Sequence, residues 1–165
     1  MRVLGIDPGT LNLGYGVVDE EGGEMTMVVC GVVSLPAKVP VERRLSSLYK
    51  KLCEVVARYR PDEVAIEEPF VAGNARSALA IGRAQTVAIL AAANENLPVS
   101  RYLPTQVKQQ VTTYGGSDKE QVQEMVRLQL GLDQAPQPSD AADALAVAIC
   151  HIHQRHVERL LAGSK

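Results

Sequence analysis

Four acidic residues have the types and positions of a metal site. Asp7 ends one apolar run, Glu67 ends another, and Asp140 and Asp143 stand three residues apart in an Ala-rich segment. Mg²⁺ prefers oxygen ligands. Two such ions about 3.5–4 Å apart stabilise both the attacking and the leaving oxygen when a phosphodiester is cut. The pattern therefore predicts metal-assisted phosphodiester hydrolysis by two Mg²⁺ ions, with these four acids as catalytic residues and metal ligands.

Asp140 and Asp143 can share a metal because residues three apart project from one face of a helix. The positive end of the helix dipole favours their ionised forms. An alternative is that they are simply acids of a first helical turn, where such residues are common. Apolar residues at 141–142 and 144–147 surround the pair. An unpaired acid in such surroundings is costly, which favours metal binding.

The two strand-ending acids each have a competing explanation. Asp7 precedes Pro8 and Gly9, and Asp-Pro-Gly is also an ordinary turn. Glu67 is followed by Glu68, and because side chains alternate along a strand, only one of them can face Asp7. Periodicity does not choose between the two. Glycines at 14 and 16 would let a phosphate approach, or they mark turns and bulges.

Candidate nucleic-acid contacts follow the second acid. Phe70 is the single Phe of the chain and lies in a loop with Gly, Asn and Arg76. Its ring could stack on an unpaired base while Arg76 holds a phosphate. The alternative is that Phe70 fills the core. Lys108 and Lys119, each near a predicted helix start, are candidate phosphate contacts, although most single lysines are merely solvated.

The elements that must position these residues form an α/β pattern. Strands are expected at 3–7, 13–19, 25–35, 63–68 and 99–102, and helices at 41–59, 77–96, 104–113, 117–130 and 139–161. Ser117 and Glu120 form a capping box for the fourth helix. The first three strands predict an antiparallel meander. A helical crossover makes the fourth parallel to the first, so Asp7 and Glu67 should meet at one sheet edge. We expect a five-stranded mixed sheet flanked by helices.

The composition fits one folded domain over residues 1–165, with 46% hydrophobic and 22% charged residues. The net charge of −2 argues mildly against non-specific nucleic-acid binding through net charge, but leaving out the four acids gives 17 basic against 15 acidic residues. Three scattered cysteines suggest neither a disulfide framework nor a zinc site. Without a signal peptide or a membrane span, we expect a cytoplasmic protein that does not contact a membrane.

Taken together, several short motifs resemble the RuvC family of bacterial Holliday-junction resolvases. They are Gly5-Ile6-Asp7-Pro8-Gly9-Thr10, Gly14-Tyr15-Gly16, Ala65-Ile66-Glu67 with Phe70, Asn74 with Ser77-Ala78-Leu79, Gln106-Val107-Lys108-Gln109, and Asp140-Ala141-Ala142-Asp143-Ala144-Leu145-Ala146. Each motif is weak alone, but the resemblance covers nearly the whole chain in order.

The resemblance implies a ribonuclease H-like fold and a homodimer with two Mg²⁺ in each subunit. Such a dimer nicks opposite strands of a four-way DNA junction, which the RuvA and RuvB branch-migration proteins deliver. It selects Glu67 over Glu68 as the fourth acid. Phe70, Lys108 and Lys119 match DNA-contacting positions of the family.

Two other classes of protein compete with the resolvase hypothesis. An actin-like sugar kinase or ATPase also has a strand that ends in Asp-x-Gly-Thr, but the chain has no second glycine-rich phosphate loop. A non-catalytic module could bind branched nucleic acid without cutting it. The sequence also leaves open which acid bridges the metals and whether Mn²⁺ replaces Mg²⁺.

Overall fold

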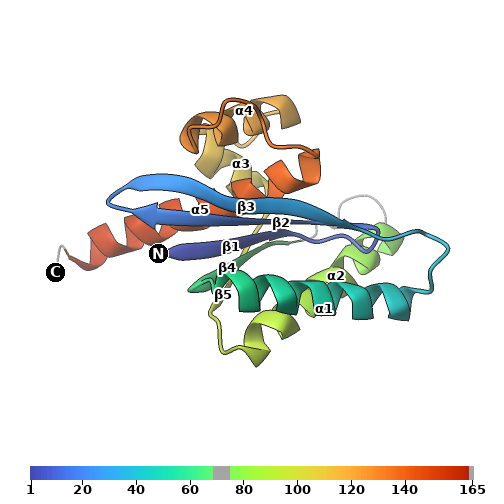
Figure 1. Cartoon of the computed structure of the whole chain (residues 1–165). Helices are drawn as coiled ribbons and strands as arrows, with labels where there is room; N and C mark the ends of the chain where they lie inside the picture. The colour runs from blue at the N-terminus through green and yellow to red at the C-terminus, as the bar shows by residue number, and fades with distance from the viewer. Residues whose placement is uncertain (69–74, 164–165) are drawn as a thin grey trace.

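The computed structural model describes residues 1–68 and 75–163. A five-stranded mixed sheet, in the order β3-β2-β1-β4-β5, has helices on both faces (Figure 1), which confirms the predicted α/β architecture. The strands are β1 (Arg2–Asp7), β2 (Asn12–Glu21), β3 (Glu24–Ser34), β4 (Glu63–Glu67) and β5 (Val99–Tyr102). The helices are α1 (Val41–Tyr59), α2 (Ala75–Asn94), α3 (Pro104–Thr112), α4 (Lys119–Gln129) and α5 (Ser139–Ala162).

The strand order brings two of the predicted acids to one edge of the sheet. β1, β2 and β3 form the expected antiparallel meander, and β4 lies parallel to β1 after the α1 crossover. Ile6 pairs with Ile66 in the parallel register. Asp7 and Glu67 therefore follow their partners side by side at the same end of neighbouring strands.

Side-chain alternation then decides which way each acid faces. Helices α1 and α2 cover one face of the sheet, while α3, α4 and α5 cover the other (Figure 1). Leu4 and Ile6 pack into the buried cluster on the α1 and α2 side, whereas Val3 belongs to the cluster on the α5 side. Because successive residues of a strand point to opposite faces, Gly5 and Asp7 are directed toward α5.

Backbone atoms of helix α5 lie directly against glycines of the sheet. A Cβ on Gly5 would overlap the carbonyl oxygen of Ala144, and a Cβ on Gly14 would overlap that of Asp140. Gly14 also pairs with Asp7 across β1 and β2. Absent side chains thus let the first turns of α5 approach the end of β1. The sequence alone is consistent with phosphate approach or with a turn or bulge at Gly14; in the structure Gly14 serves helix packing.

Most predicted boundaries agree with the structure, but the start of α4 differs. The predicted capping box of Ser117 and Glu120 is wrong. Asp118 is the N-cap, its carboxylate accepts from the Gln121 amide at 2.8 Å, and the Gln121 side chain accepts from the Asp118 amide at 3.0 Å. None of the helices in the described ranges has the length and apolar character that a bilayer crossing requires.

Candidate active site

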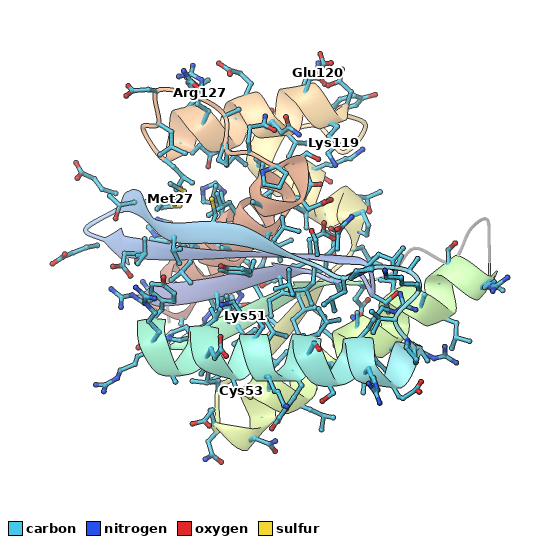
Figure 2. The ribbon with its side chains drawn as sticks, turned by 45° about the vertical axis from the view of Figure 1, so that its right-hand side comes forward. Met27, Lys51, Cys53, Lys119, Glu120 and Arg127 are labelled. Atoms are coloured by element: carbon cyan, nitrogen blue, oxygen red, sulfur yellow. The ribbon has the colours of Figure 1, made fainter. Side chains whose placement is uncertain are left out.

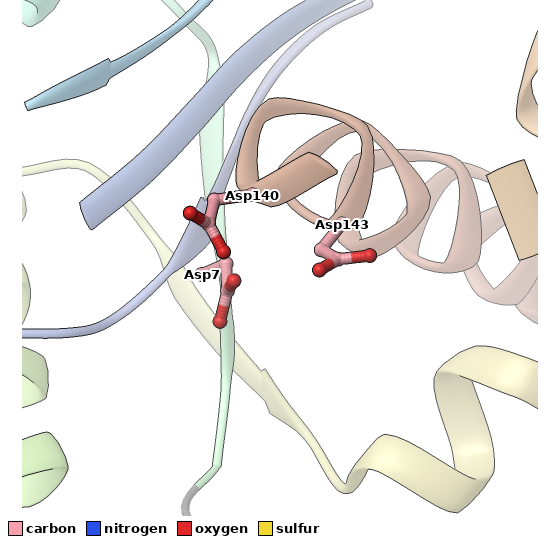
Figure 3. A group of neighbouring side chains, drawn as sticks. All are labelled: Asp7, Asp140 and Asp143. Atoms are coloured by element: carbon pink, nitrogen blue, oxygen red, sulfur yellow. The ribbon is translucent and has the colours of Figure 1, made fainter. Parts of the chain in front are cut away.

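Three acids from distant parts of the chain meet where β1 ends. Asp7 stands at the last position of β1, and Asp140 and Asp143 occupy the first turns of α5. One carboxylate oxygen of each lies within 4.8 Å of the others. Figure 3 shows the three side chains gathered where the end of β1 meets the start of α5. The three are placed to share one cation.

Glu67 lies outside that close group but lines the same cavity. The cavity has a volume of about 370 Å³ and contains all four predicted acids together with Lys108 and Lys119. Alternation along β4 sends Ala65 to the α5 side, and Glu67 follows it there. Glu68 instead lies 3.5 Å from the guanidinium of Arg101. The geometry therefore favours Glu67 over Glu68 as the fourth acid of the site. Periodicity alone could not choose between the two.

The carboxylates repel one another in partly buried surroundings. Burial, followed by the charges of Asp143 and Asp140, raises the pKa of Asp7 to about 7. Burial and the charges of Asp7 and Asp143 raise the pKa of Glu67 to about 8. Burial also raises the pKa of Asp143 above its ordinary value. Carboxylates held this close in partly buried surroundings are stabilised by added positive charge, such as that of a bound cation.

The two predicted lysines supply part of the missing charge. Lys119, at the start of α4 (Figure 2), places its ammonium 2.7 Å from Asp143 Oδ2. Burial lowers the pKa of Lys119, but its hydrogen bond to Asp143 and the nearby acids raise it overall. Lys108 lines the cavity from α3. Both lysines border the acids, in positions from which they could contact a phosphate.

The other two predicted DNA contacts are not part of this cavity as described. Phe70 lies outside the described residues, so neither stacking nor core packing is tested for it. Arg76 is exposed in the first turn of α2 and is not among the residues that line the cavity.

Sequence reasoning missed two features of the site. One is an apolar wall of the cavity, formed by Pro104, Val107, Val122 and Ala146. The other is Arg44 of α1, whose Nη1 donates to the Thr10 hydroxyl at 3.3 Å and so ties α1 to the turn after Asp7. Arg44 precedes Leu48 by one helical turn on the sheet-facing side of α1, and a charged residue at such a position was the available signal.

The donor set fits a hard divalent cation. Within the described residues, the group that could hold a metal consists of carboxylates alone, with no Cys or His. Oxygen-only ligands suit Mg²⁺ or Mn²⁺ and do not suit zinc-type sites. A ribonuclease H-like sheet with clustered acids at one edge defines a class of metal-dependent nucleases.

Comparisons with known proteins identify the family within that class. Residues 3–151 match the model of crossover junction endodeoxyribonuclease RuvC, and the chain belongs to this family. The RuvC of Dehalococcoides mccartyi strain BAV1 is 54% identical over 162 residues, covering 98% of this chain and 97% of that relative.

Two solved structures have the same fold. The Thermus thermophilus RuvC structure is 38% identical, covers 96% of this chain and 97% of its own, and has a TM-score of 0.89. Thermus thermophilus RuvC in complex with a Holliday junction substrate is also 38% identical, covers 96% of each chain and has a TM-score of 0.91. Membership of this family favours neither the sugar-kinase nor the binding-module hypothesis.

Proposed function

We infer that the chain is a crossover junction endodeoxyribonuclease that resolves four-way DNA junctions by nicking two opposite strands. The observation that carries this inference is the cavity in which acids from β1, β4 and α5 gather beside two lysines. A relative with 54% identity has the same activity in its name, and a related protein binds a Holliday junction substrate.

We propose that two Mg²⁺ ions per chain are the cofactors and that Mn²⁺ substitutes for them. Asp7, Asp140 and Asp143 would hold one ion together, since their oxygens lie within 4.8 Å of one another. Glu67 would complete the oxygen shell of the second. When bound, these ions would activate water and stabilise the charge that develops on the phosphate oxygens. Two ions would also neutralise the four carboxylates.

The protein's own residues supply position, charge and shielding. Asp7 extends from a strand that pairs on both sides, so its carboxylate is held in place while DNA enters. Lys108 and Lys119 would contact phosphates on either side of the scissile bond. The apolar wall of Val107 and Val122 would limit water near the reacting phosphate. Phe70 and Arg76 remain proposed contacts to the bases and backbone.

We further propose that the active form is a homodimer of single-domain chains. A four-way junction needs two symmetric cuts, and each chain offers one cavity with the acids. Helix α2 presents an outward row of Leu79, Arg83, Thr86 and Leu90, spaced four, three and four residues apart. Leu79 and Leu90 are 56% and 49% exposed. Such a row suits pairing with the same helix of a second copy.

The remaining proposals concern the cellular setting. RuvA and RuvB branch-migration proteins would bring the junction to the dimer, as the family resemblance implies. The site of action would be the compartment that holds the DNA, which in bacteria is the cytoplasm.

The decisive experiment measures cleavage of a synthetic four-way junction with Mg²⁺ by the parent protein and by Asp7→Asn. The parent should cut two opposite strands, and the variant should bind the junction while losing cleavage by roughly 100-fold or more. Equal cutting by the variant would exclude the proposed site. ATP turnover without DNA would instead support a kinase-like activity.

A further inference from the structure

The most exposed large apolar side chain of the described residues stands between two helices that each contribute a lysine to the cavity, and it has no assigned role. Tyr114 is 68% exposed and stands in the turn between α3 and α4. Its hydroxyl makes no hydrogen bond within the described parts of the chain. An aromatic ring left this open loses the favourable burial that such rings usually gain in the core.

The turn that carries Tyr114 is held by hydrogen bonds. The Tyr114 amide donates to the Thr112 hydroxyl at 3.3 Å, and the Ser117 hydroxyl donates to the Tyr114 carbonyl at 2.8 Å. Thr113 has a left-handed backbone with φ of 67°. The Thr112 hydroxyl donates in turn to the Lys108 carbonyl at 2.8 Å. The backbone under the ring is therefore fixed to α3.

The ring itself rests on a position without a side chain. A Cβ on Gly116 would lie only 2.7 Å from Tyr114 Cζ and from its hydroxyl oxygen. Ala at this position would push the ring aside, while the backbone of Gly116 has no left-handed φ that Ala would strain. The absence of a side chain at Gly116 therefore leaves room for the exposed ring of Tyr114.

The place of the turn connects the ring to the catalytic cavity. Lys108 and Lys119, which line the cavity with the acids, flank the turn on its two sides in the chain. A Cβ on Gly115 would lie 3.4 Å from the carbonyl oxygen of Thr105, so the turn folds back along the first half of α3. Pro104, which immediately precedes Thr105, forms part of the cavity wall.

We propose that Tyr114 is a DNA-contacting residue that stacks on a nucleobase of the cleaved strand beside the site. This inference rests on the proposed junction cleavage and adds a specific contact to it. Aromatic rings bind unstacked bases without regard to sequence, and lysines on either side hold the phosphates of the same strand. A turn fixed by hydrogen bonds presents the ring with little further ordering on binding.

The test compares four variants of the full chain on a four-way junction that carries 2-aminopurine near the cleavage point. Tyr114→Ala should weaken junction binding by roughly 5-fold or more and abolish the fluorescence quenching that stacking produces. Tyr114→Phe should keep both, because it retains the ring. Gly116→Ala should weaken binding by displacing the ring, and it should have no added effect in the Tyr114→Ala background.

A control variant separates stacking from general surface effects. Leu161→Ala removes a side chain with 67% exposure at the far end of α5, and it should change neither binding nor quenching. Thermal unfolding should be the same for the parent, Tyr114→Ala and Tyr114→Phe.

The outcomes distinguish this inference from the function on which it rests. A parent that fails to cut junctions overturns the proposed function. A parent that cuts, together with unchanged binding and quenching for Tyr114→Ala, overturns the stacking contact and leaves the proposed function intact. Loss of binding in Tyr114→Phe would show that the hydroxyl, and not stacking, makes the contact.

Discussion

At the scale of single residues, the site is an arrangement of charges that oppose folding. Asp7, Asp140 and Asp143 point their carboxylates at one another, and the ammonium of Lys119 offsets only part of the repulsion. Burial first, and then repulsion from the neighbouring acids, raises the pKa values of Asp7 and Glu67. Function and stability therefore conflict at these positions, as they often do at active sites.

The first prediction concerns Asp7→Asn in the absence of metal. With a pKa of about 7 for Asp7 and about 8 for Glu67, the folded protein binds more protons than the unfolded chain from about pH 4 to pH 8. The free energy of unfolding of the parent should fall as pH rises through this interval. The free energy of unfolding of Asp7→Asn should be higher than that of the parent by roughly 1 kcal/mol or more at pH 8, and by much less at pH 5.

Denaturant titrations at both pH values check this expectation, with chelator present. Adding Mg²⁺ at pH 8 should stabilise the parent and leave Asp7→Asn nearly unchanged, because ligand binding to the folded state raises its stability. Asp133→Asn, which removes an exposed acid, is the matched control and should show no pH-dependent gain. A variant less stable than the parent at pH 8 would contradict the proposed repulsion.

At the scale of elements, periodicity predicted the pieces of the site but not their contact. The apolar stripe of α1 and the crossover to β4 follow from residue spacing, so the shared edge of Asp7 and Glu67 was predictable. The close packing of α5 on the sheet was not predictable, because the sequence does not distinguish a glycine that forms a turn from one that allows a close approach. The role of Gly14 follows only from the three-dimensional structure, in which the Asp140 carbonyl lies against it.

The limits of prediction at α4 have a similar cause. Ser117 and Asp118 are both good N-cap residues. The choice between them depends on tertiary contacts, since the Ser117 hydroxyl is already bonded to the Tyr114 carbonyl at 2.8 Å. Local sequence does not contain that information.

The second prediction concerns Gly14, against which the start of α5 packs. Gly14→Ala places a methyl group against the Asp140 carbonyl oxygen, so the helix must shift away from β2. We expect a loss of about 1–3 kcal/mol in the free energy of unfolding, typical of overpacking. Junction cleavage by the folded fraction should also fall, because Asp140 moves with the helix.

The control for this prediction uses the same substitution at the other end of the same helix. Gly163→Ala meets nothing closer than 3.5 Å, and its backbone φ is −76°. Stability and cleavage should stay near the parent values. Parent-like cleavage in Gly14→Ala would show that α5 can shift without disturbing the acids.

At the scale of the whole molecule, the two ends of the sheet carry different arrangements of charged residues. At the end away from the acids, Arg2 lies 2.7 Å from Asp19, and Arg155 lies 3.0 Å from Glu63. At the acid end, Lys108 and Lys119 line the cavity, and the charge of Lys108 acts on Glu67 and Asp143. The net charge of −2 therefore says little about DNA binding, which depends on where the cations lie.

The third prediction concerns the proposed dimer. Leu79→Glu combined with Leu90→Glu places two acids on the outward row of α2, where charge would oppose pairing with a second copy. Sedimentation should change from a dimer to a monomer. Paired cutting of both junction strands should fall at least 10-fold, while single nicks fall less.

Leu128→Glu provides the comparison, since Leu128 is 54% exposed on α4 and lies outside the α2 row. It should sediment and cut as the parent does. Dimers that persist in the double α2 variant would assign the interface to another surface.

The position of α5 across the sheet has a consequence for how the protein is made. A ribosome releases β1 and β4 before α5, which contributes Asp140 and Asp143. A growing or prematurely terminated polypeptide that stops before α5 holds only Asp7 and Glu67 of the four acids. Such a chain cannot assemble the three-carboxylate group, so translation itself delays the appearance of a DNA-cutting activity until α5 has been made.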